Sequence, residues 1–165
     1  MSIIEILLRE TEQEAQTTRK FLSIVPTDKY DWKPHPKSMS LKQLATHIAE
    51  LPQWVSMAIK TDGLDFAASP YKQVDVANNE ELLAYFEKNY TEGRADLEAT
   101  NEEVLEQPWT LRNGDEIYFT NTKYDTVRVS ISQTTHHRAQ LGVYLRLLNI
   151  PIPGSYGPSA DEMGM

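Results

Sequence analysis

Residues 38–54, with the sequence SMSLKQLATHIAELPQW, combine a helix start, an apolar helical face and an internal proline. Ser40 and Gln43 form the pattern of a capping box, in which two side chains satisfy free backbone groups at a helix start. Pro52 lies further on, where its ring removes a hydrogen bond and should kink the helix. The pattern predicts one kinked helix over residues 40–60. One helical face carries Leu44, His47, Ile48, Leu51, Val55 and Ala58.

Three further segments show helical spacing of their apolar residues, at residues 2–25, 80–100 and 124–149. The connections at 26–39 and 61–78 are long, and long crossovers permit parallel neighbours in a bundle. Between the last two helices, Asn113-Gly114 separates two alternating stretches, which predicts a short β-hairpin over 108–120. We therefore expect an all-α four-helix bundle with long crossover connections and one hairpin.

The composition indicates the class of protein. A length of 165 residues predicts one domain over residues 1–165. The absence of cysteine excludes disulfides, a thiolate nucleophile and Cys-ligated zinc. A net charge of −8 disfavours nucleic-acid binding, which depends on Lys and Arg. No apolar run approaches the roughly 20 residues that span a membrane. The first residues do not resemble a signal peptide, so we expect a cytoplasmic protein.

Histidines are the candidates for chemistry. His47 lies on the apolar face of its helix, and His137 has the inward phase of the last helix. His136 is turned about 100° from His137, and His35 lies in a proline-rich loop. Two inward histidines on different helices favour a metal site, because neutral imidazole is a common metal ligand. The alternative is that each is a core histidine with a satisfied hydrogen bond. Glu50 could orient the ring of His47 or lie in solvent, and Arg138 could pair with a surface acid.

A wider set of motifs resembles the DinB/YfiT-like family. The motifs are DWKPHPKSMS at 31–40, the helix that carries His47, QTTHHRAQL at 133–141 and PIPGSYGPSADE at 151–162. The resemblance covers nearly the whole chain, and HHRAQL is its most specific part. It implies a four-helix bundle, often a homodimer, that holds a divalent metal such as zinc, nickel or manganese.

The resemblance also implies the metal ligands. One histidine comes from the second helix and two come from the last helix, at positions i and i+4. These positions match His47, Gln133 and His137, so a glutamine stands where the family has a histidine. An amide oxygen binds zinc or nickel more weakly than imidazole does.

Two functions are compatible with these residues. The first is a metal-dependent enzyme, a thiol transferase or a hydrolase-like one, in which the metal lowers the pKa of a low-molecular-weight thiol for attack on an electrophile. That thiol must come from outside, because the chain has no cysteine. The second is a non-catalytic, dimeric helical domain that binds a small ligand or a protein partner and retains a degenerate metal site.

Overall fold

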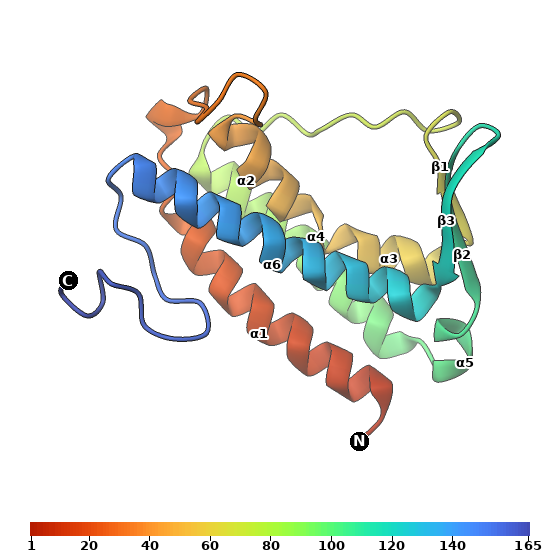
Figure 1. Cartoon of the computed structure of the whole chain (residues 1–165). Coiled ribbons are helices and arrows are strands. Elements are labelled where there is room, and N and C mark those ends of the chain that lie inside the picture. The colour runs from red at the N-terminus through yellow and green to blue at the C-terminus, as the bar shows by residue number, and fades with distance from the viewer.

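The structure is a computed structural model that describes residues 1–165, and it is mostly helical with one small sheet (Figure 1). The α-helices are α1 (Ile3–Ser23), α2 (Leu41–Glu50), α3 (Gln53–Lys60), α4 (Asn79–Ala99), α5 (Glu102–Leu105) and α6 (Lys123–Leu147). The 3-10 helix η1 covers Thr27–Lys29, and the strands are β1 (Gly63–Asp65), β2 (Pro108–Asn113) and β3 (Glu116–Thr122). None of the helices combines the length and the apolar character that crossing a membrane requires.

Side-chain caps determine where three of the long helices begin. A capping box starts α2 as predicted, because Ser40 Oγ accepts from the Gln43 backbone and Gln43 Oε1 accepts from the Ser40 backbone. Ser2 with Glu5 caps α1 in the same way, and Thr122 with Asp125 caps α6. The bounds of α1, α4 and α6 agree with the predicted segments within a few residues.

The predicted kink at Pro52 is a complete break between α2 and α3. Proline has no N–H to continue the hydrogen-bond ladder, so nearby carbonyl groups need other partners. Asn89 Nδ2 of α4 donates to the carbonyl of Ala49 at 3.0 Å, and Ser130 Oγ of α6 donates to the carbonyl of Leu51 at 2.7 Å. Both polar side chains are buried, and these backbone bonds compensate for their burial.

The all-α prediction is too narrow, because the structure contains a three-stranded sheet of order β1-β2-β3. The predicted hairpin is present as antiparallel β2 and β3, and Gly114 in its turn has a φ of 59°. Strand β1 was not predicted; it pairs in parallel with β2, and Gly63 lies opposite Thr110. The sheet is anchored by Trp109, which is fully buried and donates from Nε1 to Thr61 Oγ1 at 3.1 Å.

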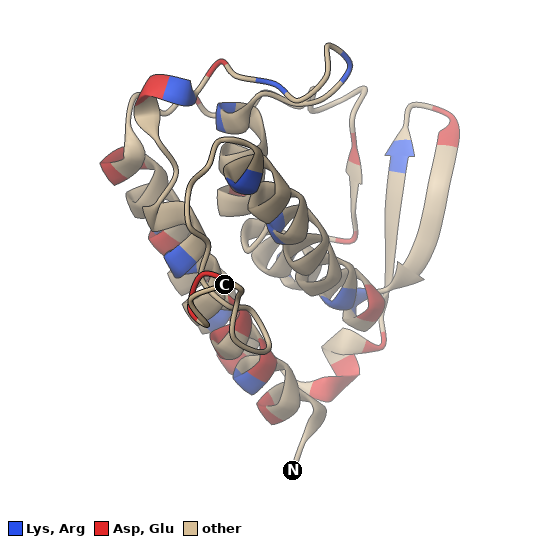
Figure 2. Ribbon diagram, turned by 60° about the vertical axis from the view of Figure 1, so that its left-hand side comes forward, with Lys and Arg blue, Asp and Glu red and all other residues tan.

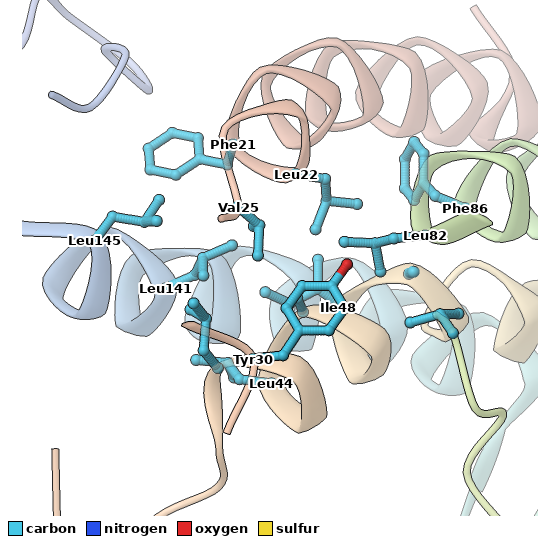
Figure 3. Packing of buried hydrophobic residues seen from close by; sticks show 14 of the residues in the cluster. Phe21, Leu22, Val25, Tyr30, Leu44, Ile48, Leu82, Phe86, Leu141 and Leu145 are labelled. Carbon is cyan, nitrogen blue, oxygen red and sulfur yellow. The ribbon is translucent and has the colours of Figure 1, made fainter. Parts of the chain in front are cut away.

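The main core lies where α1, α2, α4 and α6 meet (Figure 3). Its labelled members are Phe21, Leu22, Val25, Tyr30, Leu44, Ile48, Leu82, Phe86, Leu141 and Leu145. A second cluster joins α3 to the N-terminal half of α6 and the start of α1. The buried leucines of α4 are Leu82 and Leu97, whereas Leu83 is only partly buried.

Surface ion pairs connect α1 to its neighbours. Acidic and basic residues are interspersed along this helix (Figure 2). Arg19 pairs with Glu87 of α4 at 2.5 Å, and Arg128 of α6 pairs with Glu10. Such exposed pairs each contribute about 0–1 kcal/mol, so the packed apolar face dominates the stability of α1.

The inner face of α6 centres on Arg138, which is buried and does not pair with a surface acid. Its guanidinium lies 2.6 Å from the carboxylate of Glu14 on α1 and also donates to Thr18 Oγ1 at 3.1 Å. Tyr156 of the C-terminal tail accepts from Arg138 Nη2 at 3.1 Å and donates to Glu14 Oε1 at 2.9 Å. The conspicuous arginine of HHRAQL therefore has a structural role, since it joins α1, α6 and the tail.

Candidate functional site

His47 is oriented by a buried carboxylate on the next turn of α2. Its Nδ1 lies 2.6 Å from Glu50 Oε1, and the Glu50 side chain is only 8% exposed. The hydroxyl of Tyr71, from the connection between β1 and α4, donates to the same oxygen at 2.7 Å. A carboxylate accepts this hydrogen bond, so Nδ1–H of His47 donates to Glu50, and in the neutral ring the lone pair is on Nε2. The orienting role considered for Glu50 is thus present in the structure.

His137 has a similar arrangement on α6. Its Nδ1 lies 2.7 Å from the side-chain oxygen Oε1 of Gln140. The Nδ1–H therefore points to this oxygen, which leaves the lone pair on Nε2. Burial lowers the pKa of His137 below its usual value; the Gln140 bond opposes this shift, and the nearby His47 and His136 add to it. The ring is therefore neutral at pH 7, which is the form that binds a metal ion.

The two oriented histidines converge between α2 and α6, as predicted. Their ring centroids lie 4.7 Å apart, with the ring planes at 76° in an edge-on arrangement. His136 contacts the outer side of the pair, because its ring centroid lies 4.8 Å from that of His137 while its own side chain is exposed. His35 is exposed in the loop before α2, and its Nδ1 accepts from the Lys37 backbone at 3.2 Å.

Gln133 lies one helical turn before His137 on α6, and the structure leaves its side chain exposed. It forms no hydrogen bond with either histidine. No third histidine, cysteine or carboxylate joins His47 and His137 in a metal-binding group. The protein itself thus brings together two imidazoles, and Gln133 is positioned next to them along the helix.

The histidine pair fits one metal ion by its spacing and its free nitrogens. Zinc binds an imidazole nitrogen at about 2.1 Å, so two rings on one tetrahedral ion have centroids roughly 5 Å apart. The observed 4.7 Å agrees with this separation. Acceptors on both Nδ1 atoms correspond to the outer-shell contacts that orient histidine ligands in metal sites. The donor set fits a site with two protein nitrogens and several positions left for other ligands.

A cleft of about 380 Å³ lies beside His47. Its base includes His47 and Glu50, and its walls include Met39, Trp54, Phe66 and Tyr71. Phe66 and Tyr71 belong to the connection between β1 and α4, whose apolar residues have no periodicity that would mark them as site residues. Burial and the neighbouring Glu50 carboxylate raise the pKa of Tyr71, so its hydroxyl stays protonated and remains a donor.

Comparison with known proteins identifies the fold. The structure is similar to a DinB-like protein from Bacillus subtilis, with a TM-score of 0.70 and 21% identity over 90% of this chain and 96% of that one. It is equally similar to a DinB-like protein from Bacillus cereus ATCC 10987, with a TM-score of 0.70 and 19% identity over 92% and 97% of the two chains. Comparison with curated proteins gives no match.

The sequence comparison covers almost every residue. The model of the DinB family matches residues 1–164, which include both histidines, the intervening sheet and the C-terminal tail. Together with the fold, this match confirms the resemblance on which the expected ligand positions rest. The chain belongs to the DinB family.

Proposed function

We propose that this protein is a metal-dependent enzyme whose divalent ion is held by Nε2 of His47 and Nε2 of His137. The observation that carries the proposal is the converging pair of rings, 4.7 Å apart, each with its Nδ1 engaged by an acceptor on its own helix. A divalent ion there would supply Lewis-acid chemistry and lower the pKa of a thiol or water. Gln133 is the third protein ligand in this proposal, through its amide oxygen.

The residues around the pair have defined parts in the reaction. Glu50 keeps the proton of His47 on Nδ1, and Gln140 does the same for His137. Tyr71 donates to Glu50 and so fixes the carboxylate at the base of the cleft. Trp54 and Phe66 contribute aromatic surface to the lining of the cleft. The substrate thiol must be an external molecule, because the chain offers no sulfur nucleophile of its own.

Calorimetric titration with zinc, nickel and manganese tests the metal site directly. Wild-type protein should bind one ion per chain, and His47→Ala and His137→Ala should each weaken binding at least about tenfold. His35→Ala is the matched control, because it removes an exposed imidazole outside the site. Saturable binding that survives both site substitutions would place the ion elsewhere. Thiol conjugation to a model electrophile then tests the reaction class with loaded protein.

The second candidate function is ligand binding without catalysis. The observation that favours it is the exposed Gln133, which leaves His47 and His137 without a third ligand from the protein. Under this alternative the cleft beside His47 is the functional feature. A ligand that binds only the native state must raise its stability. If the protein binds no metal ion, added metal should therefore leave the melting temperature of wild type unchanged.

The homodimer implied by the resemblance is part of the proposal. Val143 and Leu147 are exposed on α6, at the i and i+4 spacing of one helical face. Apolar side chains at that spacing support an association surface. Sedimentation of wild type and Leu147→Glu tests it, since a charge at this face should convert a dimer to a monomer.

A further inference from the structure

The cleft beside His47 has one carboxylate among its lining side chains, that of Glu50. Its one basic side chain is the imidazole of His47, and neither Lys nor Arg lines it. The only basic side chain within ion-pair distance of Glu50 is the imidazole of His47. A carboxylate that is mostly removed from water is stabilised by a positive charge or by further hydrogen-bond donors. The cleft therefore favours a ligand that brings one or the other.

Glu50 has an oxygen left for such a ligand. Both of its hydrogen bonds, from His47 Nδ1 and from the Tyr71 hydroxyl, end on Oε1. Oε2 takes part in neither bond, and the residue lines the cleft although it is only 6% exposed overall. Because two donors on different elements hold the carboxylate, its position is fixed before any ligand arrives.

The apolar side chains that line the cleft indicate what the uncharged part of the ligand should be. Met39, Trp54, Phe66 and Tyr71 come from the segment before α2, from α3 and from the connection after β1. These side chains present apolar surface, and aromatic faces also attract cations. The volume of about 380 Å³ lies within the range of small-molecule sites.

We infer that this cleft binds a small organic amine in its protonated form, with the ammonium group on Glu50 Oε2 and an apolar body against Trp54 and Phe66. The inference names the substrate class of the proposed site, and it rests on the proposed function only for what the histidine pair then does to the bound molecule. Binding itself needs Glu50 and the apolar walls, so it is measurable without any metal.

The test uses two probes of matched size and opposite charge, 2-phenylethylamine and 3-phenylpropionate, titrated into full-length protein in the presence of EDTA. The amine should bind saturably, and the carboxylate should show no saturable binding over the same concentrations, because it meets Glu50 with like charge. Equal binding of both probes, or no saturable binding of the amine, would overturn the inference.

Two substitutions locate the ammonium group. Glu50→Gln keeps an oxygen that can accept from His47 and Tyr71 but removes the charge, and it should weaken amine binding about tenfold. Glu98→Gln makes the same charge change on the exposed end of α4, and it should leave amine binding unchanged. Equal affinities in wild type and a folded Glu50→Gln would contradict the assignment.

A spectroscopic measurement on wild type keeps the inference testable if Glu50→Gln does not fold. The indole N–H resonance of Trp54 should shift on addition of the amine, whereas that of Trp32, outside the cleft, should not. A shift confined to Trp32 would show that the amine binds elsewhere. All these titrations contain EDTA, so they measure amine binding independently of metal binding. Amine binding can therefore be observed when the metal titration shows no binding, and it can be absent when metal does bind.

Discussion

The guanidinium of Arg138 and the carboxylate of Glu14 form a buried ion pair at 2.6 Å that joins α6 to α1. Their side chains are 2% and 13% exposed, so removal of one partner leaves a charge in a poorly solvated place. Arg138→Met should therefore destabilise the protein by about 3–5 kcal/mol, measured by urea unfolding. The double variant Arg138→Met with Glu14→Leu should recover part of this loss. A single variant as stable as wild type would show that the pair is solvated in solution.

Gly93 is predicted to be intolerant of a side chain. A Cβ at this position of α4 would lie 2.6 Å from the carbonyl oxygen of Pro52 and 3.3 Å from Cβ of Val55. Alanine is the better helix former, but the backbone at the α2–α3 break would have to move away. We expect Gly93→Ala to cost about 1–3 kcal/mol in thermal unfolding. Glu92→Ala, on the exposed side of the same turn, should be close to neutral. A Gly93→Ala variant as stable as wild type would mean that the backbone between α2 and α3 can move away from the added methyl group at little cost.

Gln133→His tests the third ligand position. One turn before His137, a histidine would project from the same face of α6 and supply a stronger donor than the amide. Zinc and nickel affinities measured by calorimetry should rise at least about tenfold over wild type. Tyr124→His is the control, because this exposed position on α6 has no histidine three or four residues away. Equal affinity in wild type and Gln133→His would remove position 133 from the site.

Asp161 should give the C-terminal tail an acid-sensitive attachment. Its hydrogen bond with Arg146, and then the bond from the Ile152 backbone, lower the pKa of Asp161 from 3.8 to about 2. Because the folded pKa lies below the unfolded one, the stabilisation is complete above pH 3.8 and is lost as the pH falls towards about 2. The free energies of unfolding of wild type and Asp161→Asn should differ at pH 5 and converge near pH 2. Asp115→Asn, in the hairpin turn, serves as the control, and a constant difference across this range would contradict the prediction.

Local signals were sufficient to predict the long helices. The capping box at Ser40, Pro26 and Pro151 beyond helix ends, and the Asn113-Gly114 turn all act within a few residues of the chain. Strand β1 could not be predicted in this way. It covers only Gly63–Asp65, and its stability comes from pairing with β2, more than 40 residues away in sequence.

The rotational phase of α6 explains why the burial of Arg138 was not predicted. Its inner face carries polar side chains at every fourth position, Thr126, Ser130, Thr134 and Arg138, all of them buried. Because these side chains are polar, the spacing of apolar residues does not reveal this face. That spacing instead favours the flanking Tyr144 and Leu148, which are only partly buried. His137 is adjacent to this face and therefore lies at the edge of the core, where its ring meets that of His47.

The connection between β1 and α4 supplies Phe66 and Tyr71 to the cleft, whereas α2 and α6 supply the histidines. Connections accept substitutions and changes of length more readily than packed helices do. A change at Phe66 can therefore alter the apolar lining of the cleft while Glu50 and both histidines keep their places on packed helices.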